Sequence, residues 1–396
     1  MNWQAYNPDW AFHTALRARA ARWQRQKLLS TAQLAAIEAA YPLPYYRPVW
    51  PLRVGLFIFA WLGLASGGGF LFMLAGGNSP FVAGLLGGLA CFGILELLVR
   101  RSRFYHAGAD NALLYAGLGI AGGLIFYLFF EAGGWSINDT GLYAAFLPLL
   151  LLLAVLLAAI VRYADALVTV VAGTTVLLLV LLTAAIIPFG ILVLPFVAMA
   201  TAGVALRSYR AIVRRLAGTA LADYYATCLQ TLKVLALVVF YLGGNYLVVR
   251  EGNAMLNNQS PSLQVPFAPL FYALTAGVPL LYIGLGLRRA DRALLLLGLL
   301  TLAFSLFTLR YYRSVLPPEV AAVAGGLVLT VAAGALLRYL RPARFGLTSQ
   351  PDDEPRHFNL ENLIQAQTAH APEAPTGSGF AFGGGQSGGG GATGRF

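Results

Sequence analysis

The sequence predicts an all-α, polytopic integral membrane protein with about ten transmembrane helices, on three observations. Of the 396 residues, 58% are hydrophobic and 11% are charged, whereas a soluble domain spends about a quarter of its residues on charge. Apolar runs of about 18 residues or more recur along the chain, which is typical of helices that cross the hydrocarbon core. Basic residues gather between alternate runs, as they do in the cytoplasmic loops of such proteins.

Charged residues and turn residues divide the apolar sequence into ten predicted spans. These are 52–75, 80–99, 111–130, 142–161, 166–187, 190–206, 232–249, 266–287, 293–309 and 319–340. The fifth and sixth come from one uncharged stretch, 166–206, which as a single helix would be about 60 Å long, twice the roughly 30 Å hydrocarbon core. We therefore predict two helices there, joined by a tight hairpin at Pro188 and Gly190.

The basic residues predict that both termini are cytoplasmic. With ten spans, every lysine and arginine except Arg250, Arg310 and Arg313 falls on the same side as the N-terminus. No signal peptide precedes the first span, so we expect that span to act as both targeting signal and anchor in the inner membrane of a bacterium. The net charge of +11 follows from this arrangement, and it favours contact with anionic lipid over nucleic acid.

Residues 1–51 are predicted to form a cytosolic helical pair followed by a connector. The first helix carries an apolar stripe at helical spacing, formed by Phe12, Leu16, Ala20 and Trp23. Ser30 and Gln33 fit a capping box that opens the second helix, and the proline- and aromatic-rich connector 41–51 suits the membrane interface. Two interpretations are open: a basic amphipathic element for the inner leaflet or a partner, or a solvated pair that packs on itself.

The N-terminal stretch WQRQKLLSTAQLAAIEAAYP, followed by a span, resembles the start of a family of bacterial multi-span membrane proteins of unknown function. The resemblance covers about the first fifth of the chain. The matching residues are Trp23, Leu28, Leu29, Ser30, Gln33 and Ile37. Lys27 stands where the family pattern has glycine, so the break between the two helices is expected to differ. The resemblance implies a short cytosolic helical segment ahead of a multi-span region, and it implies no catalytic residue.

The predicted transmembrane domain is 52–342. One further segment, 207–233, lies between two of its spans, and another, 343–396, follows it. Residues 207–233 are predicted to run as a helix along the inner membrane surface, where their arginines serve either as topogenic charges or as contacts for lipid headgroups. The candidate headgroup contacts are Arg207, Arg210, Arg214 and Arg215. The glycine-rich tail 343–396 is predicted to be disordered, as a linker or as an aromatic-bearing arm for self-association, with one short helix over 358–367.

A near-repeat in the sequence suggests an internal duplication. ADNALL at 109–114 recurs as ADRALL at 290–295, where Asp110 and Asp291 are each predicted to cap the N-terminus of a span. Prolines and paired arginines keep the same order around both copies, which aligns spans 1–4 with spans 7–10. An even number of spans separates the copies, so they would be parallel repeats, as in some transporters. Shared capping chemistry is the alternative explanation.

Few polar residues lie within the predicted spans. Glu96 is expected to form an interfacial ion pair with Arg100, four residues on, with proton coupling as the alternative. Asn245 is expected either to bond a neighbouring helix or to line a path for a ligand. Pro188 and Pro195 either break the sixth span and free carbonyls for a ligand or kink a short hairpin.

The sequence contains no recognisable catalytic or metal-binding pattern. Its two cysteines and four histidines are scattered, and it has no Ser/His/Asp set, HExxH motif or phosphate-binding loop. We therefore predict a protein that is not an enzyme and has no cofactor or metal. The first functional hypothesis is a sensor or assembly factor that binds membrane lipids, a cytosolic protein partner or a second copy of itself, and not nucleic acid. The alternative is a transporter or lipid-handling carrier with its site between the two four-helix repeats.

Overall fold

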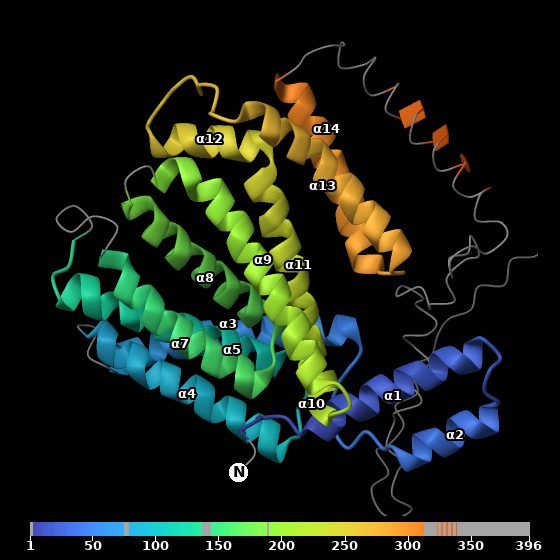
Figure 1. The fold of residues 1–396 in the computed structure, drawn as a ribbon. Coiled ribbons are helices and arrows are strands. Elements are labelled where there is room, and N and C mark those ends of the chain that lie inside the picture. The colour runs from blue at the N-terminus through green and yellow to red at the C-terminus, as the bar shows by residue number, and fades with distance from the viewer. Residues whose placement is uncertain are drawn as a thin grey trace, which may run out of the picture. The chain divides into compact units, whose positions relative to one another are not determined.

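The computed structural model of the protein describes residues 3–74, 79–136, 144–187 and 190–312, with isolated helical positions between 323 and 338. The secondary structure in these ranges is helical (Figure 1), which confirms the predicted all-α class. The predicted tail 343–396 and Pro188 lie outside the described residues, as does nearly all of the predicted tenth span, 319–340.

Nine helices in the described ranges are long and apolar enough to cross a membrane. They are α3 (Trp50–Leu74), α4 (Pro80–Arg101), α5 (Ala109–Tyr127), α7 (Phe146–Tyr163), α8 (Ala166–Ile186), α9 (Gly190–Leu216), α11 (Ala226–Gly244), α13 (Ala268–Arg288) and α14 (Arg292–Tyr312). A π-helical turn, η1 (Leu128–Ala132), extends α5. These helices correspond one to one with the first nine predicted spans, so the protein is a polytopic membrane protein. Phe59 and Leu300, 75% and 69% exposed, are typical of the apolar side chains that such helices turn toward lipid.

The uncharged stretch 166–206 forms a hairpin, as predicted. α8 ends at Ile186 and α9 begins at Gly190. A Cβ atom at Gly190 would lie 1.8 Å from the carbonyl oxygen of Ala184, so the turn admits glycine alone. Of the two interpretations of Pro195, a break in the sixth span is wrong, because α9 runs through this proline without interruption. Pro195 lies in the second turn of α9, where it removes one backbone hydrogen bond without ending the helix.

The predicted surface helix over 207–233 is wrong. α9 continues to Leu216, and Gly218 then adopts a φ of +79°, a left-handed conformation that ends the helical run. The short helix α10 (Ala220–Tyr224) follows, and α11 begins at Ala226. The arginines of this segment therefore extend a membrane span. The 27 residues of α9 are about 40 Å long, which exceeds the roughly 30 Å hydrocarbon core.

The N-terminal segment forms two helices, α1 (Pro8–Arg25) and α2 (Thr31–Ala40). The predicted capping box is present, because the Ser30 hydroxyl accepts from the Gln33 amide at 3.2 Å and the Gln33 side chain accepts from the Ser30 amide at 2.9 Å. α1 packs against α10 as well as against α2 (Figure 1). Within the predicted apolar stripe only Ala20 is fully buried, and Trp23 is 44% exposed. The helical pair thus packs on a segment between two spans and not only on itself.

The seventh predicted span, 232–249, extends past the end of the helix that forms it. α11 ends at Gly244, and a separate amphipathic helix, α12 (Tyr246–Leu256), begins after one intervening residue. That residue is Asn245, whose φ of −80° and ψ of 125° are extended and interrupt the helix. α10 and α12 lie at opposite ends of α11 (Figure 1). Asn245 is therefore at the outer end of the span in the predicted topology, and not deep within it.

The two aspartates of the near-repeat have different roles. Asp291 directly precedes α14 and accepts from the amide of Leu294 at 3.2 Å, as predicted. Asp110 lies inside the first turn of α5, whose N-cap is Gly108, and it accepts from the amides of Ala107 and Gly108 at 2.9 and 3.0 Å. The cap prediction for Asp110 is wrong, because this carboxylate stabilises the turn before the helix. The parallel repeat stays a prediction, since its last member is the tenth span.

Candidate functional site

Glu96 joins α4 to α7. Its Oε1 atom accepts from Arg162 Nε at 2.7 Å and from the Tyr163 hydroxyl at 2.7 Å, both from the end of α7. The predicted ion pair with Arg100 is present at 3.2 Å between Arg100 Nε and Oε2, without hydrogen-bond geometry. The closer ion pair, 2.6 Å to Arg162, could not be found from the sequence, which marks Arg162 only as a basic residue at the end of a span. The geometry is that of an interhelical clamp.

Asp110 is fully buried, and the N-terminal segment covers it. The Tyr6 hydroxyl donates to Asp110 at 2.9 Å, and Tyr6 is 2% exposed. Burial and the neighbouring carboxylate raise the pKa of Tyr6 well above its ordinary value, so the hydroxyl keeps its proton. The amide of Ala5 donates to the carbonyl of Arg162 at 2.8 Å, which attaches the same segment to α7. Neither Tyr6 nor this contact carries a sequence signal.

Asp165 holds α5 against the start of α8. One oxygen accepts from the amides of the first turn of α8, as an N-cap does. The other oxygen accepts from Asn111 Nδ2 at 2.9 Å and from the Tyr115 hydroxyl at 3.0 Å. Asn111 and Tyr115 are four residues apart and so share one face of α5. Each oxygen of this buried carboxylate therefore accepts two hydrogen bonds from the protein itself.

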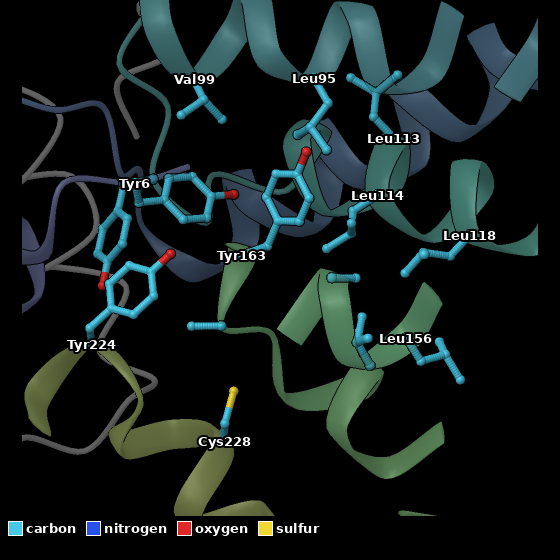
Figure 2. Close-up of a cluster of buried hydrophobic side chains, with 14 of the residues drawn as sticks. Tyr6, Leu95, Val99, Leu113, Leu114, Leu118, Leu156, Tyr163, Tyr224 and Cys228 are labelled. Carbon is cyan, nitrogen blue, oxygen red and sulfur yellow. The ribbon is translucent and has the colours of Figure 1, made fainter. Parts of the chain in front are cut away.

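An aromatic and aliphatic core surrounds these polar contacts (Figure 2). Tyr6, Tyr163 and Tyr224 join this core from the N-terminal segment, α7 and α10, and the Tyr163 ring points toward Leu95 of α4. The rings of Tyr6 and Tyr163 lie 6.3 Å apart, edge to face, and the Tyr224 hydroxyl donates to the carbonyl of Arg162. Leu95 of α4, which is fully buried, belongs to the same core. Burying this much apolar surface fastens the N-terminal segment to the ends of the spans that lie beside it.

Asn245 is fully buried and bonds neighbouring helices, the first of its two predicted interpretations. Its Nδ2 donates to the hydroxyls of Tyr241 at 2.9 Å and Thr308 at 3.1 Å. Its Oδ1 accepts from two amides in the first turn of α12. The next amide, that of Tyr246, donates to Thr275 Oγ1 at 2.9 Å. Asn245 thus connects α11 and α12 to α14, and it lines none of the cavities described below.

A cavity of about 590 Å³ lies between α3, α4 and α5. Its walls are apolar side chains and glycines, with Tyr115 as the polar exception. The α5 residues on its wall, 115–120, are roughly 10–17 Å along the helix from its inner end. Half of a roughly 30 Å hydrocarbon core is about 15 Å, so these wall residues lie near the midpoint of the length that a membrane-spanning helix needs.

Glycines keep this cavity open. A Cβ atom at Gly63, Gly67 or Gly119 would meet no heavy atom within 4 Å. By contrast, a Cβ at Gly84 or Gly88, on the seam between α4 and α5, would lie 3.0 or 3.3 Å from a side chain of α5. The small residues of α4 therefore serve close helix packing, as their spacing suggests, whereas those that face α3 leave unfilled space.

Two more apolar cavities lie among the later helices. One, of about 290 Å³, is covered by α12 and includes Pro195 of α9 in its wall. The other, of about 460 Å³, lies between α7, α8, α9 and α11 and includes Cys228. The second has walls from both proposed repeats, since α7 is the fourth span and α11 the seventh. A fourth cavity, of about 550 Å³, is open and polar and contains Lys233.

The four arginines that the sequence marks as candidate headgroup contacts are exposed at the inner end of α9. They are Arg207, Arg210, Arg214 and Arg215. Within the described residues none of them has a carboxylate at ion-pair distance. Ala202 is buried on the opposite side of α9, which packs on α8 and α11. Their free guanidinium groups are accessible to headgroups or to solvent.

No group of three or more His, Cys, Asp or Glu side chains in the described part of the chain could hold a metal ion. The structure thus brings together Glu96 with Arg162, and Asn245 with Thr308, but it does not unite Glu96, Asn245, Pro195 and the arginines of α9 in one site. Comparisons with protein-family models, with curated proteins and with solved structures give no match to this chain.

Proposed function

We propose that this chain is a non-enzymatic membrane protein that binds lipid, and that the cavity between α3, α4 and α5 receives an acyl chain. That cavity is the observation that carries the proposal. It has apolar walls, it is at the depth of the hydrocarbon core, and glycines on α3 and α5 leave part of its space unfilled. A flexible hydrocarbon chain is the ligand that suits such walls, and lipid supplies it at high local concentration.

The state of the polar groups supports a binding role over a catalytic one. Asp110, Asp165 and Asn245 use both polar atoms of their side chains in hydrogen bonds to other segments or to backbone amides, and both oxygens of Glu96 lie at ion-pair distance from arginines. A catalytic group needs a free functional atom that faces a substrate. The basic residues support an inner-membrane location with both termini cytoplasmic. In that topology the helical pair is accessible to a cytosolic partner. Leu28, in the turn between α1 and α2, is 68% exposed and offers such a partner an apolar contact.

The test is photocrosslinking of the full chain in nanodiscs that contain a phospholipid with a diazirine near the end of one acyl chain. Label is expected on peptides from α3, α4 and α5. Gly119→Leu fills the cavity from a position where a Cβ meets nothing, so it should reduce this labelling severalfold. Gly93→Leu is the matched control: it adds the same side chain to an exposed glycine of α4 that also has nothing within 4 Å and does not line the cavity. Equal labelling of both variants and the parent chain would contradict the proposal.

A lipid-handling carrier is the second candidate, on the strength of the cavity whose walls come from both α7 and α11. A carrier must let a headgroup cross the bilayer, so its activity is measurable without knowledge of the lipid it prefers. Vesicles with a fluorescent phospholipid in both leaflets, treated with a membrane-impermeant quencher, report this movement. If reconstituted protein does not raise the rate above that of protein-free vesicles, the carrier hypothesis fails and the binding proposal stands.

A further inference from the structure

The inner ends of α11, α13 and α14 surround an open polar cavity of about 550 Å³. Lys233 comes from α11, and Arg289, Asp291 and Arg292 come from the turn between α13 and α14. Lys233 Nζ lies 2.6 Å from Asp291 Oδ2, and both side chains are largely buried, at 12% and 26% exposed. This turn is the ADRALL segment, which the proposed lipid function does not use.

We call the cavity and the turn at ADRALL the basic corner. The corresponding turn at ADNALL is closed. There the hydroxyl of Tyr6 reaches the fully buried Asp110, and the N-terminal segment fills the space in front of the helix end. At ADRALL none of the described residues covers Asp291 in this way, and the cavity opens outward. The turn before a span is thus filled by the protein at one of these places and accessible at the other.

The basic corner has an excess of positive charge. Lys233 and Arg289 line it against one carboxylate, Asp291, which is already paired with Lys233. The arginine that closes α13, Arg289, is exposed and has no carboxylate at ion-pair distance within the described residues. Guanidinium groups bind phosphate through paired N–H donors, and a desolvated lysine adds a point charge.

The position of the corner identifies the source of the phosphate. α13 and α14 are apolar spans that end at Arg288 and begin at Arg292, so the turn between them is at the level of the lipid headgroups. Leu296, on the cavity wall one turn into α14, is 57% exposed and offers an apolar surface beside the charged one. A molecule with a phosphate and an attached hydrocarbon chain meets both surfaces.

We propose that this corner binds the headgroup phosphate of an anionic phospholipid from the surrounding leaflet. Arg289 contacts the phosphate oxygens, Lys233 adds positive charge beside them, and Asp291 reduces that charge. The proposal goes beyond the acyl-chain cavity and does not depend on it, because the two sites use different helices.

The test is a titration of the full-length protein in detergent with phosphatidylglycerol, followed by native mass spectrometry of the bound lipid. Arg289→Gln should weaken binding about fivefold, the effect of one cation near a lipid surface. Asp291→Asn should tighten binding by a similar factor, because it removes the opposing charge while asparagine keeps the helix cap. Arg101→Gln, the exposed arginine that ends α4, is the matched control and should change nothing.

The opposite signs of the two variants separate binding from misfolding, since a folding defect cannot tighten binding. Equal weakening by Arg289→Gln and Arg101→Gln, or no gain with Asp291→Asn, would overturn the proposal. So would full displacement of the lipid by millimolar inorganic phosphate, because the corner would then be a site for soluble phosphate. Gly119→Leu should leave this titration unchanged even if it abolishes acyl-chain labelling.

Discussion

The hydroxyl of Tyr6 donates a 2.9 Å hydrogen bond to the carboxylate of Asp110, which is 104 residues later in the chain. Both side chains are almost completely buried, so this bond ties the N-terminal segment to the start of α5 where water does not compete. The adjacent contact between the Ala5 amide and the Arg162 carbonyl ties it to α7 as well. The segment is therefore packed onto the starts of α5 and α8 and the end of α7, and belongs to the same unit as the spans.

Loss of the Tyr6 hydroxyl should loosen this attachment. Tyr6→Phe keeps the ring but leaves Asp110 short of a donor, which should cost about 1–3 kcal/mol of unfolding free energy. Thermal unfolding in detergent and proteolysis of the N-terminal segment measure the two consequences. Tyr46→Phe is the control, because Tyr46 is 42% exposed and its hydroxyl has no described hydrogen bond. Equal stability of Tyr6→Phe and the parent chain would show that the bond is dispensable.

Acidification should destabilise the same region through His106. Burial lowers the pKa of His106; Asp110 and Asp165 oppose this shift, and Arg47 and Arg53 add to it. A base whose pKa is lower in the folded state than in the unfolded chain contributes stability above the unfolded value, about 6.5, and that contribution is lost as the pH falls through the folded pKa. We expect a lower melting temperature from about pH 6.5 downward.

His106→Asn tests this expectation, since asparagine tolerates the φ of +49° found at this position and does not titrate. The variant should lose part of the dependence of melting temperature on pH between 7.5 and 5. His13→Asn, on the surface of α1, is the control. An unchanged pH profile in His106→Asn would mean that another group causes any acid sensitivity.

Asn245→Ala should weaken the attachment of α11 to α12 and α14 and so lower the stability of the fold. It removes the cap of α12 and the bonds to Tyr241 and Thr308, for an expected loss of about 2 kcal/mol. Asn257→Ala is the control, because the Asn257 side chain bonds only to Asn253, one turn away in the sequence. A similar melting temperature for both variants would contradict a structural role for Asn245.

Gly190→Ala should disrupt the hairpin between α8 and α9. The added methyl group would lie 1.8 Å from the carbonyl oxygen of Ala184, and relief of that clash by backbone movement should cost about 1–3 kcal/mol or more. Gly203→Ala adds the same group to α9 where nothing lies within 4 Å, so it should be neutral or slightly stabilising. Chemical denaturation of the two variants in parallel would reveal whether the turn tolerates a side chain.

The sequence by itself determined the membrane class, the positions of nine spans, the α8–α9 hairpin and the capping box at Ser30. These features are local: a span is an apolar run bounded by charge, and a cap is a side chain within three residues of the amide that it binds. The sequence misjudged the ends of two spans. The helix of span 190–206 continues to Leu216, and the helix of span 232–249 ends at Gly244 because Asn245 finds partners on α14 as well as in its own chain segment.

Only the tertiary structure decided which helices meet. Glu96 has a local partner in Arg100, but it bonds more closely to Arg162, and Asp110 bonds to Tyr6, because helix packing brings distant segments together. The cavities and the open basic corner follow from the same packing. In a membrane the lipid-facing and protein-facing sides of a helix are both apolar, so hydrophobic periodicity does not distinguish them, and the partners of each face cannot be read from the sequence.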